Sequence, residues 1–381
     1  MIYFDNAATT FPKPEVVYEA MKNFMSHIGA NPGRSAHKLS LNAARVVFET
    51  RDAIAEIFNV PDSKQIVFTS NATESLNLGI QGLLSEGDHV ITTSMEHNSV
   101  MRPLRYLEGS RGIQITVVNC SSEGELDLDS LRSSIRGDTK LIVINHASNV
   151  IGTILPIEEI GNISKDIPFM VDAAQTAGAY PIDVERSNID LLAFTGHKGL
   201  LGPTGSGGLY IREGLDLKPL KFGGTGSNSE REEQPDLFPD KYESGTLNTV
   251  GIAGLGAAVK FIMERGVDRI RSHEVDLTKR MLSGLGDIEG VTIYGTRDAD
   301  KQTATVSINI DGLEPSQVGY LLDREFDIMT RVGLHCSPAA HKTIGMLPKG
   351  TIRLGMGYFN TADQVDFALN AIHRIVRKGV K

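Results

Sequence analysis

Seven short runs of apolar, mostly β-branched residues recur between residues 65 and 213, in a stretch where strand-like and helical patterns alternate. Most runs are bounded by Gly, Pro, Asn or Asp, which interrupt strands. Runs this apolar are typical of strands that are buried on both faces, as in a parallel sheet covered by helices. The pattern therefore predicts an α/β fold with a mostly parallel seven-stranded sheet. The runs are residues 65–70, 88–94, 113–119, 139–146, 167–174, 189–196 and 207–213.

The last third of the chain mixes strand and helix patterns at shorter range, which predicts a second, smaller α+β domain. Thr361 and Gln364 have the spacing of a capping box and should begin the last helix. We expect a large domain over residues 15–255 and a small domain made of residues 1–14 and 256–381. The other elements expected here are helices at 250–285 and 315–325, and strands at 291–295, 303–310 and 350–355.

Composition excludes several classes of protein. The 381 residues carry a formal net charge of −9 and scattered basic residues, which argues against nucleic-acid binding. No apolar run approaches the roughly 18 residues of a membrane helix, and the first residues lack the pattern of a secretory signal. With two distant cysteines, Cys120 and Cys336, we expect neither a disulfide framework nor a metal site. A cytoplasmic location is the default expectation.

Chemistry in open parallel sheets sits beyond the carboxyl ends of the strands, so the residues after each run are the candidates. "NATES" (71–75) follows the first run and leads into a helix, whose N-terminal N–H groups and dipole attract phosphate. Thr73 adds a hydroxyl group there. A plain helix cap is the alternative interpretation.

Three more polar residues follow strands. His97 and Asn149 come after the second and fourth runs, and each alone could be purely structural. Asp172 ends five residues that are mostly apolar, so we expect it to be buried and to need a cationic partner. A structural salt bridge would satisfy it equally well.

Lys198 lies at the mouth of the sixth run, between His197 and Gly199. A desolvated lysine loses proton affinity and becomes a nucleophilic amine, which forms Schiff bases with carbonyl compounds. A phosphate seat, an imidazole, a buried carboxylate and this lysine at one sheet edge predict a pocket for pyridoxal phosphate. The aldehyde needs the lysine, and the ring nitrogen needs the carboxylate.

Several motifs occur in a familiar order over nearly the whole chain: "YFDNAATT", "SNATESLN", "MEHNS", "HASNVIGT", "VDAAQTAG", "TGHKGLLGPTG", "ESGTLNT", "RVGLHCSP" and "RLGMGYFNT". On these motifs the sequence resembles the class V aminotransferase branch of the fold-type I pyridoxal phosphate enzymes, and within it the cysteine desulfurases. The resemblance implies that Lys198 binds the cofactor covalently, Asp172 pairs with its ring nitrogen, Gln175 faces its phenolic oxygen and His97 stacks on its ring. The remaining cofactor-binding residues it implies are Ala72, Thr73, Asn149, Thr195, His197 and, from the second subunit of a homodimer, Thr246.

Arg353 is expected on a strand of the small domain, in "TIRLGMGYF", and a planar guanidinium suits an amino-acid carboxylate. A surface arginine is the alternative interpretation. Arg331 and Asn149 are expected helpers. Cys336 lies on a loop beside His335, which makes it the better thiolate candidate, whereas Cys120 ends the strand-like "ITVVNC" and is expected in the core. By the resemblance, Cys336 takes sulfur from cysteine as a persulfide and alanine is released.

The "R-x-G-x-H-C" spacing is similar to the group II desulfurases and the selenocysteine lyases. Ser337 stands where those proteins usually have alanine, and Leu334 where a more polar residue is common. The expected function is a cysteine desulfurase that passes sulfur to an acceptor protein, for example in iron–sulfur cluster assembly. The alternatives are a selenocysteine lyase or related thiol amino acid β-lyase and, more distantly, an inactive scaffold.

Overall fold

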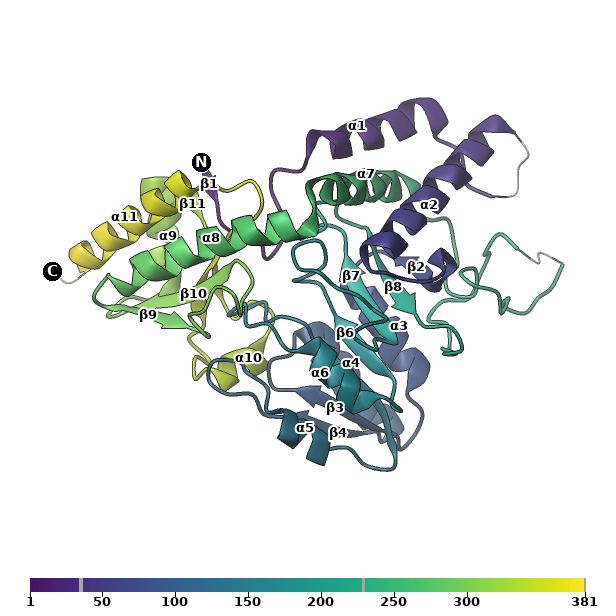
Figure 1. Cartoon of the computed structure of the whole chain (residues 1–381), viewed down its shortest axis with the longest axis horizontal. Coiled ribbons are helices and arrows are strands. Elements are labelled where there is room, and N and C mark those ends of the chain that lie inside the picture. The colour runs from purple at the N-terminus through teal and green to yellow at the C-terminus, as the bar shows by residue number, and fades with distance from the viewer. Residues whose placement is uncertain (34–36, 228–229, 380–381) are drawn as a thin grey trace.

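The computed structural model describes residues 1–33, 37–227 and 230–379, and its centre is a seven-stranded sheet (Figure 1). The strand order is β2-β8-β7-β6-β5-β3-β4, and within this sheet β8 runs antiparallel to its neighbours while the other pairs are parallel. All seven predicted strands and the mostly parallel sheet are confirmed. The strands are β2 (Ile66–Thr69), β3 (His89–Thr93), β4 (Gln114–Val118), β5 (Thr139–Asn145), β6 (Phe169–Asp172), β7 (Leu191–Thr195) and β8 (Gly207–Ile211).

Helices cover both faces of this sheet, which explains why its strands are apolar without alternation. Successive residues of β5 enter different cores: Ile142 packs with the core on one face, and Leu141 and Val143 pack with the core on the other. The first face carries α2 (Lys38–Ile57), α6 (Ile157–Ser164) and α7 (Thr249–Arg265), and the second carries α3 (Ala72–Leu83) and α4 (Asn98–Arg111). The shorter α1 (Glu15–Asn23), η1 (Phe24–Ile28), η2 (Ser63–Gln65) and α5 (Leu128–Ser133) complete this part.

A second, antiparallel sheet has the order β12-β13-β10-β9 and its own hydrophobic core. The first strand of the chain, β1, pairs in parallel with β11 and adds Ile2 and Phe4 to this core. The predicted capping box forms, because Thr361 and Gln364 exchange two hydrogen bonds of 3.3 Å at the start of α11. The elements are β1 (Ile2–Tyr3), α8 (Val267–Gly286), β9 (Val291–Tyr294), β10 (Thr305–Ile310), α9 (Pro315–Phe326), β11 (Ile328–Met329), β12 (Arg331–Gly333), α10 (Pro338–Thr343), β13 (Thr351–Gly355) and α11 (Ala362–Gly379).

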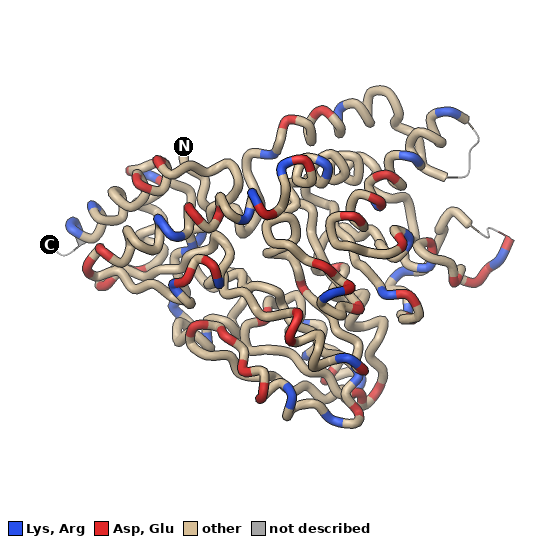
Figure 2. Tube along the Cα trace, in the orientation of Figure 1, with Lys and Arg blue, Asp and Glu red and all other residues tan. Residues whose placement is uncertain are grey.

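The division into domains at residues 14 and 255 stays a proposal. Residue 255 lies inside α7, and the buried residues of this helix as far as Ile262 pack with the first core of the large sheet. Along the described part of the chain, Lys and Arg are scattered among Asp and Glu (Figure 2). In those same residues, no helix combines the length and the apolar composition that a membrane crossing requires.

Candidate functional site

A pocket lies at the carboxyl ends of β5, β6 and β7, beside the N-termini of α3 and α4; we call it the inner pocket. Parallel strands end at the same sheet edge, so residues far apart in sequence meet there. The fold thus brings together the predicted residues that follow the strands. Those that line the inner pocket are Ala72, Thr73, His97, Asn149, Asp172, Gln175, Thr195, His197 and Lys198.

Asp172 is the last residue of β6 and is buried. Its backbone carbonyl accepts a hydrogen bond from His146 (2.9 Å), and its Oδ1 accepts one from the Ala174 N–H (2.9 Å). Burial raises the pKa of the Asp172 carboxyl above its usual value. Because burial removes the water that would solvate the carboxylate, a cation placed against it would stabilise its ionised form.

Lys198 lies in the turn after β7 and lines the same pocket. Burial lowers the pKa of its ammonium group to about 8, against the opposing influence of Asp172. At pH 7 about a tenth of Lys198 is then the free amine, far more than for an ordinary lysine, and the free amine is the form that attacks carbonyl carbon. The buried position of Lys198 at the end of the strand therefore makes its amine more nucleophilic at neutral pH.

His97 is the N-cap of α4, and its ring orientation is set by Ser99. The Ser99 N–H donates to Nδ1 (3.0 Å), and the hydroxyl group of Ser99 lies 2.8 Å from Nδ1 and 2.7 Å from the Thr73 hydroxyl. Because Nδ1 accepts, the proton of the neutral ring is on Nε2. Burial lowers the pKa of His97 to about 4, so the ring is neutral at physiological pH.

One end of the inner pocket fits an anion. The first-turn N–H groups of α3, including those of Ala72 and Thr73, have no partner within a helix. Thr195 Oγ1 and His197 Nδ1 are buried beside them, and no described residue offers either atom a hydrogen bond. Since buried polar atoms are ordinarily bonded, this donor set fits a phosphate group.

Cys336 lies between β12 and α10, and it is exposed. It lines a cavity of about 500 Å³, the outer cavity, which shares Thr73, His97 and Ser99 with the inner pocket. The Cys336 carbonyl accepts a hydrogen bond from the Asn98 N–H (3.0 Å), which joins this segment to the start of α4. The predicted loop cysteine therefore stands at the entrance of the inner pocket.

His335 does not support the thiol in the way its neighbouring position suggested. Its ring is buried, its Nε2 lies 3.0 Å from the Thr351 hydroxyl, and burial lowers its pKa to about 2. Consequently His335 carries no positive charge that could stabilise a thiolate at Cys336. Adjacent residues point in different directions here because one side chain fills a core and the other faces the cavity.

Arg353 is 2% exposed and is already paired. Its Nη2 lies 2.8 Å from Asp5 Oδ1 and its Nη1 donates to the Asn149 carbonyl (2.9 Å), whereas its buried Nε has no partner among the described residues. Arg331 is exposed, with Nη1 at 3.8 Å from the other Asp5 oxygen. The guanidinium is thus held close to the pocket wall, and the N–H of its buried Nε remains unused among the described residues.

Two carboxyl groups of the site were missed in the sequence. Asp5 belongs to the "YFDNAATT" motif, and its charge among apolar neighbours was the available signal. Glu96 is fully buried, accepts hydrogen bonds from the Thr93 hydroxyl (2.7 Å) and the Asn145 N–H (3.1 and 3.2 Å), and so braces β3 against β5. Burial raises the pKa of Glu96 to about 8.

Thr246 and Cys120 lie away from the inner pocket. Thr246 is exposed, precedes α7, and lines a different cavity together with Phe48. Cys120 was expected inside a core strand, but it lies beyond the end of β4 and is only half-buried. Because β4 is the edge strand of the sheet, its residues receive cover from fewer neighbours.

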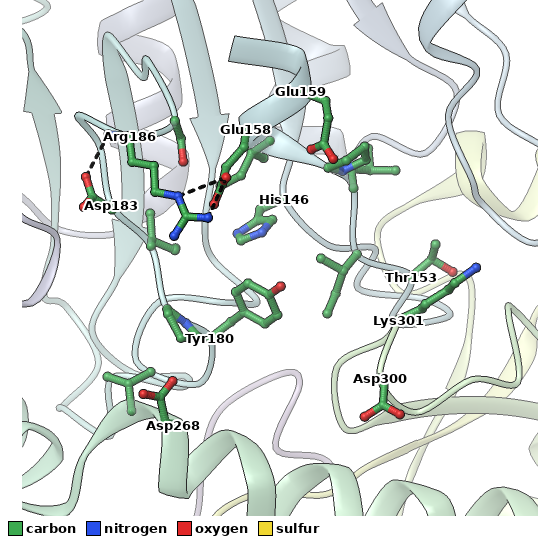
Figure 3. A pocket seen from close by; sticks show the side chains of 18 of the residues that line it. His146, Thr153, Glu158, Glu159, Tyr180, Asp183, Arg186, Asp268, Asp300 and Lys301 are labelled. Carbon is green, nitrogen blue, oxygen red and sulfur yellow. Dashed lines mark hydrogen bonds and ion pairs between the residues drawn. The ribbon is translucent and has the colours of Figure 1, made fainter. Parts of the chain in front are cut away.

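A larger cavity of about 870 Å³ lies behind the inner pocket, and none of the predicted site residues lines it. Figure 3 shows His146 and Tyr180 among its walls, with Arg186 bound to Glu158. Its lysine and arginine, Lys301 and Arg186, are both engaged in ion pairs. Its size alone therefore does not mark it as the reactive site.

Comparisons with known proteins agree with this geometry. The family model described as aminotransferase class-V matches residues 2–367. A probable cysteine desulfurase of Pyrococcus abyssi is 38% identical, over 99% of this chain and 94% of the relative, and a Dictyoglomus turgidum protein named cysteine desulfurase IscS is 33% identical, over 99% and 95%.

Among solved structures, the apo structure of cysteine desulfurase from Thermococcus onnurineus matches with a TM-score of 0.92 and 36% identity, covering 99% of this chain and 95% of that one. The family match spans nearly the entire chain, so it includes both the inner pocket and the cysteine at its entrance. This chain therefore belongs to the class-V aminotransferase family and, within it, to the pyridoxal phosphate-dependent cysteine desulfurases.

Proposed function

We propose that this enzyme converts L-cysteine to L-alanine and transfers the sulfur to Cys336 as a persulfide. The observation that carries the proposal is that the two cavities adjoin each other and share lining residues. Cys336 stands exposed in an outer cavity whose walls include Thr73 and His97, and both of these also line the inner pocket that holds Lys198. A substrate bound at Lys198 would therefore present its sulfur toward the thiol.

The residues of the inner pocket fit pyridoxal phosphate. Thr195, His197 and the start of α3 would bind the phosphate, and the buried Asp172 would pair with the protonated ring nitrogen. Gln175 would face the phenolic oxygen, and the neutral His97 would lie against the ring. When bound, the cofactor supplies an aldehyde and a ring that accepts electrons from the substrate.

Lys198 would hold the cofactor covalently and move the substrate's Cα proton. An amine whose pKa lies near 8 can both accept and return a proton at neutral pH, which an ordinary lysine does poorly. Its burial also keeps water from competing for the same atoms. We therefore assign both the attachment and the proton transfer to this one side chain.

Cys336 would take the sulfur directly. Its thiolate forms a bond to the sulfur of the bound substrate as the carbon–sulfur bond breaks, and the bonding electron pair stays with the carbon. That carbon takes up a proton, and alanine leaves. One protein thiol and one cysteine thus give one persulfide and one alanine, so the step needs no further reductant. A thiol of an acceptor protein then takes the sulfur.

Arg353 would bind the substrate carboxylate. Its buried Nε has no partner among the residues described, and a carboxylate would satisfy it. Asn149 lies beside it on the pocket wall, and Arg331 adds a positive charge at the rim. Because Asp5 already pairs with Nη2 of Arg353, we expect the substrate carboxylate to bind the same guanidinium through its remaining donors.

We propose further that two copies assemble, with Thr246 of one copy binding the phosphate of the other. Thr246 is exposed and lines a cavity together with Phe48, and the first helices of the chain carry further exposed apolar side chains, which favours burial against a partner. A cytoplasmic location and a role in iron–sulfur cluster assembly remain proposals. The exposed apolar residues of α1, η1 and α2 are Val16, Tyr18, Met25, Leu39, Leu41 and Phe48.

The test of the reaction compares wild type with Lys198→Ala. Wild type with L-cysteine should form alanine and, with a reductant, sulfide in equal amounts, and Lys198→Ala should form neither and lose the covalent visible band. Feeding selenocysteine separately distinguishes the lyase alternative, because a lyase makes alanine and selenide from it while leaving cysteine untouched. Full alanine production by Lys198→Ala would overturn the assignment.

A further inference from the structure

The segment of residues 334–337, which we call the cysteine segment, has an unusual backbone. His335 and Cys336 both adopt the left-handed conformation, with φ of 49° and 58°. Side chains with a Cβ atom disfavour this region, and two such residues in succession are held only when surrounding contacts impose the conformation. The contacts that hold this segment therefore also decide where the thiol of Cys336 stands.

Asn149 supplies the central contacts. Its Nδ2 donates to the His335 carbonyl (2.7 Å), and its Oδ1 accepts a hydrogen bond from the Ser337 hydroxyl (2.6 Å). One amide group thereby binds the residue before Cys336 and the residue after it. Asn149 and Ser337 are 7% and 0% exposed, so water does not compete for these bonds.

The Ser337 hydroxyl is not used in the way its position suggests. Ser337 is the N-cap of α10, where a serine usually accepts a hydrogen bond from the N–H groups of the first helical turn. Here its side chain makes no capping bond and donates to Asn149 instead. This donation also fixes which end of the Asn149 amide faces the His335 carbonyl, because only an oxygen accepts from a hydroxyl donor.

We propose that Ser337 is a positioning residue: acting through the Asn149 amide, its hydroxyl fixes the cysteine segment and thereby the Cys336 thiol at the outer cavity. The inference rests on the proposed function, in which Cys336 takes the sulfur. Ser337 itself lines neither the inner pocket nor the outer cavity; only its partner Asn149 reaches the wall of the inner pocket. Its removal should therefore slow sulfur transfer and leave the earlier binding steps alone.

The test uses the holoenzyme with Cys120→Ala as background, so that Cys336 is the one remaining cysteine. Adding Ser337→Ala should keep the cofactor content and leave KM for cysteine within about twofold, while kcat falls about tenfold, the effect of one ordinary hydrogen bond. Alkylation of Cys336 by iodoacetamide should become several times faster, because a loosened segment lets the already exposed thiol reach the reagent in more orientations. This second readout does not depend on turnover.

The matched control is Thr343→Val on the same helix. The Thr343 hydroxyl donates to the Ser94 carbonyl (3.0 Å), so it also ties α10 to the region of the large sheet, but it does not bond to Asn149. This variant should keep both kcat and the alkylation rate. Equal losses in the two variants would mean that Ser337 serves general packing, and the proposal would be wrong.

Wild-type kcat and alkylation in Ser337→Ala would also overturn the inference, while Cys336→Ala shows separately whether the proposed reaction holds. If Ser337→Ala does not fold, Ser337→Thr replaces it in the test. That variant keeps the hydroxyl, so kcat within about twofold of wild type supports the proposal. A tenfold loss in folded Ser337→Thr with its Asn149 bond intact contradicts it.

Discussion

The two cysteines of this enzyme have opposite surroundings. Cys120 follows the edge strand β4, where burial raises the pKa of its thiol to about 11. Cys336 is exposed, lies on a left-handed turn, and is tied through its neighbours to Asn149 and through its own carbonyl to Asn98. A thiol reacts when it is accessible and ionised, so the same side chain is inert in one region and available in the other.

The role of a cysteine in this enzyme depends on where the fold places its side chain. It does not depend on which residue precedes it in the sequence. His335 directly precedes Cys336, yet its neutral ring is buried against Thr351. The residues that line the same cavity as the thiol come from α3 and from α4 with its N-cap, both more than two hundred positions away; His97 and Arg102 are among them.

The largest effect should come from Cys336→Ala. Without the thiol, the carbon–sulfur bond has no acceptor for its sulfur, so alanine formation should fall about a thousandfold or more. Cofactor binding and the coloured adduct with cysteine should persist, because those depend on Lys198. Stopped-flow spectra with alanine quantitation measure both. Alanine formation at the wild-type rate would show that the sulfur leaves without a protein thiol.

The pH dependence of alkylation sharpens the contrast. A thiol whose pKa is raised to about 11 gains thiolate roughly tenfold per pH unit below that value, so Cys120 should react about a hundredfold faster at pH 10 than at pH 8. Mass spectrometry of peptides after brief iodoacetamide treatment should find Cys336 modified first at pH 8. Preferential modification of Cys120 at that pH would reverse the comparison.

Arg353→Ala tests the region next to the cysteine segment. Loss of a buried guanidinium that binds the substrate carboxylate should raise KM for cysteine by about ten- to a hundredfold and leave the resting cofactor spectrum unchanged. Arg331→Ala is the matched control, since this exposed arginine lies 3.8 Å from the same Asp5 and should change KM only a few fold. A changed resting spectrum with normal KM would place Arg353 at the cofactor.

The smallest effect should come from Cys120→Ala. Cys120 is half-buried and packs at the border of a small core, so its replacement should lower the free energy of unfolding by about 1 kcal/mol or less. Alanine production should equal that of the wild type. Denaturant unfolding and the same activity assay check both expectations, and a clear loss of activity would give Cys120 an unforeseen role.

The sequence by itself determined the large sheet. Its strands are apolar on both faces, and a run such as residues 139–146 has no stable environment except between two helical layers. The capping box at Thr361 was equally readable, because the bonds that form it join residues three positions apart. Local periodicity and local hydrogen bonding need no knowledge of distant segments.

For the candidate site, the sequence predicted which residues follow the strands, but it did not predict the contacts that orient their side chains. Lys198, Asp172 and His97 could be proposed as neighbours because parallel strands end at one edge. The direction of each side chain depended on contacts between separate segments: Arg353 pairs with Asp5, 348 positions away, and Asn149 bonds to His335 and Ser337 on either side of Cys336, 186 and 188 positions away. His335 bonds to Thr351, 16 positions further on in β13. Only the tertiary structure decided these, because burial and pairing between separate segments leave no periodic pattern in the sequence.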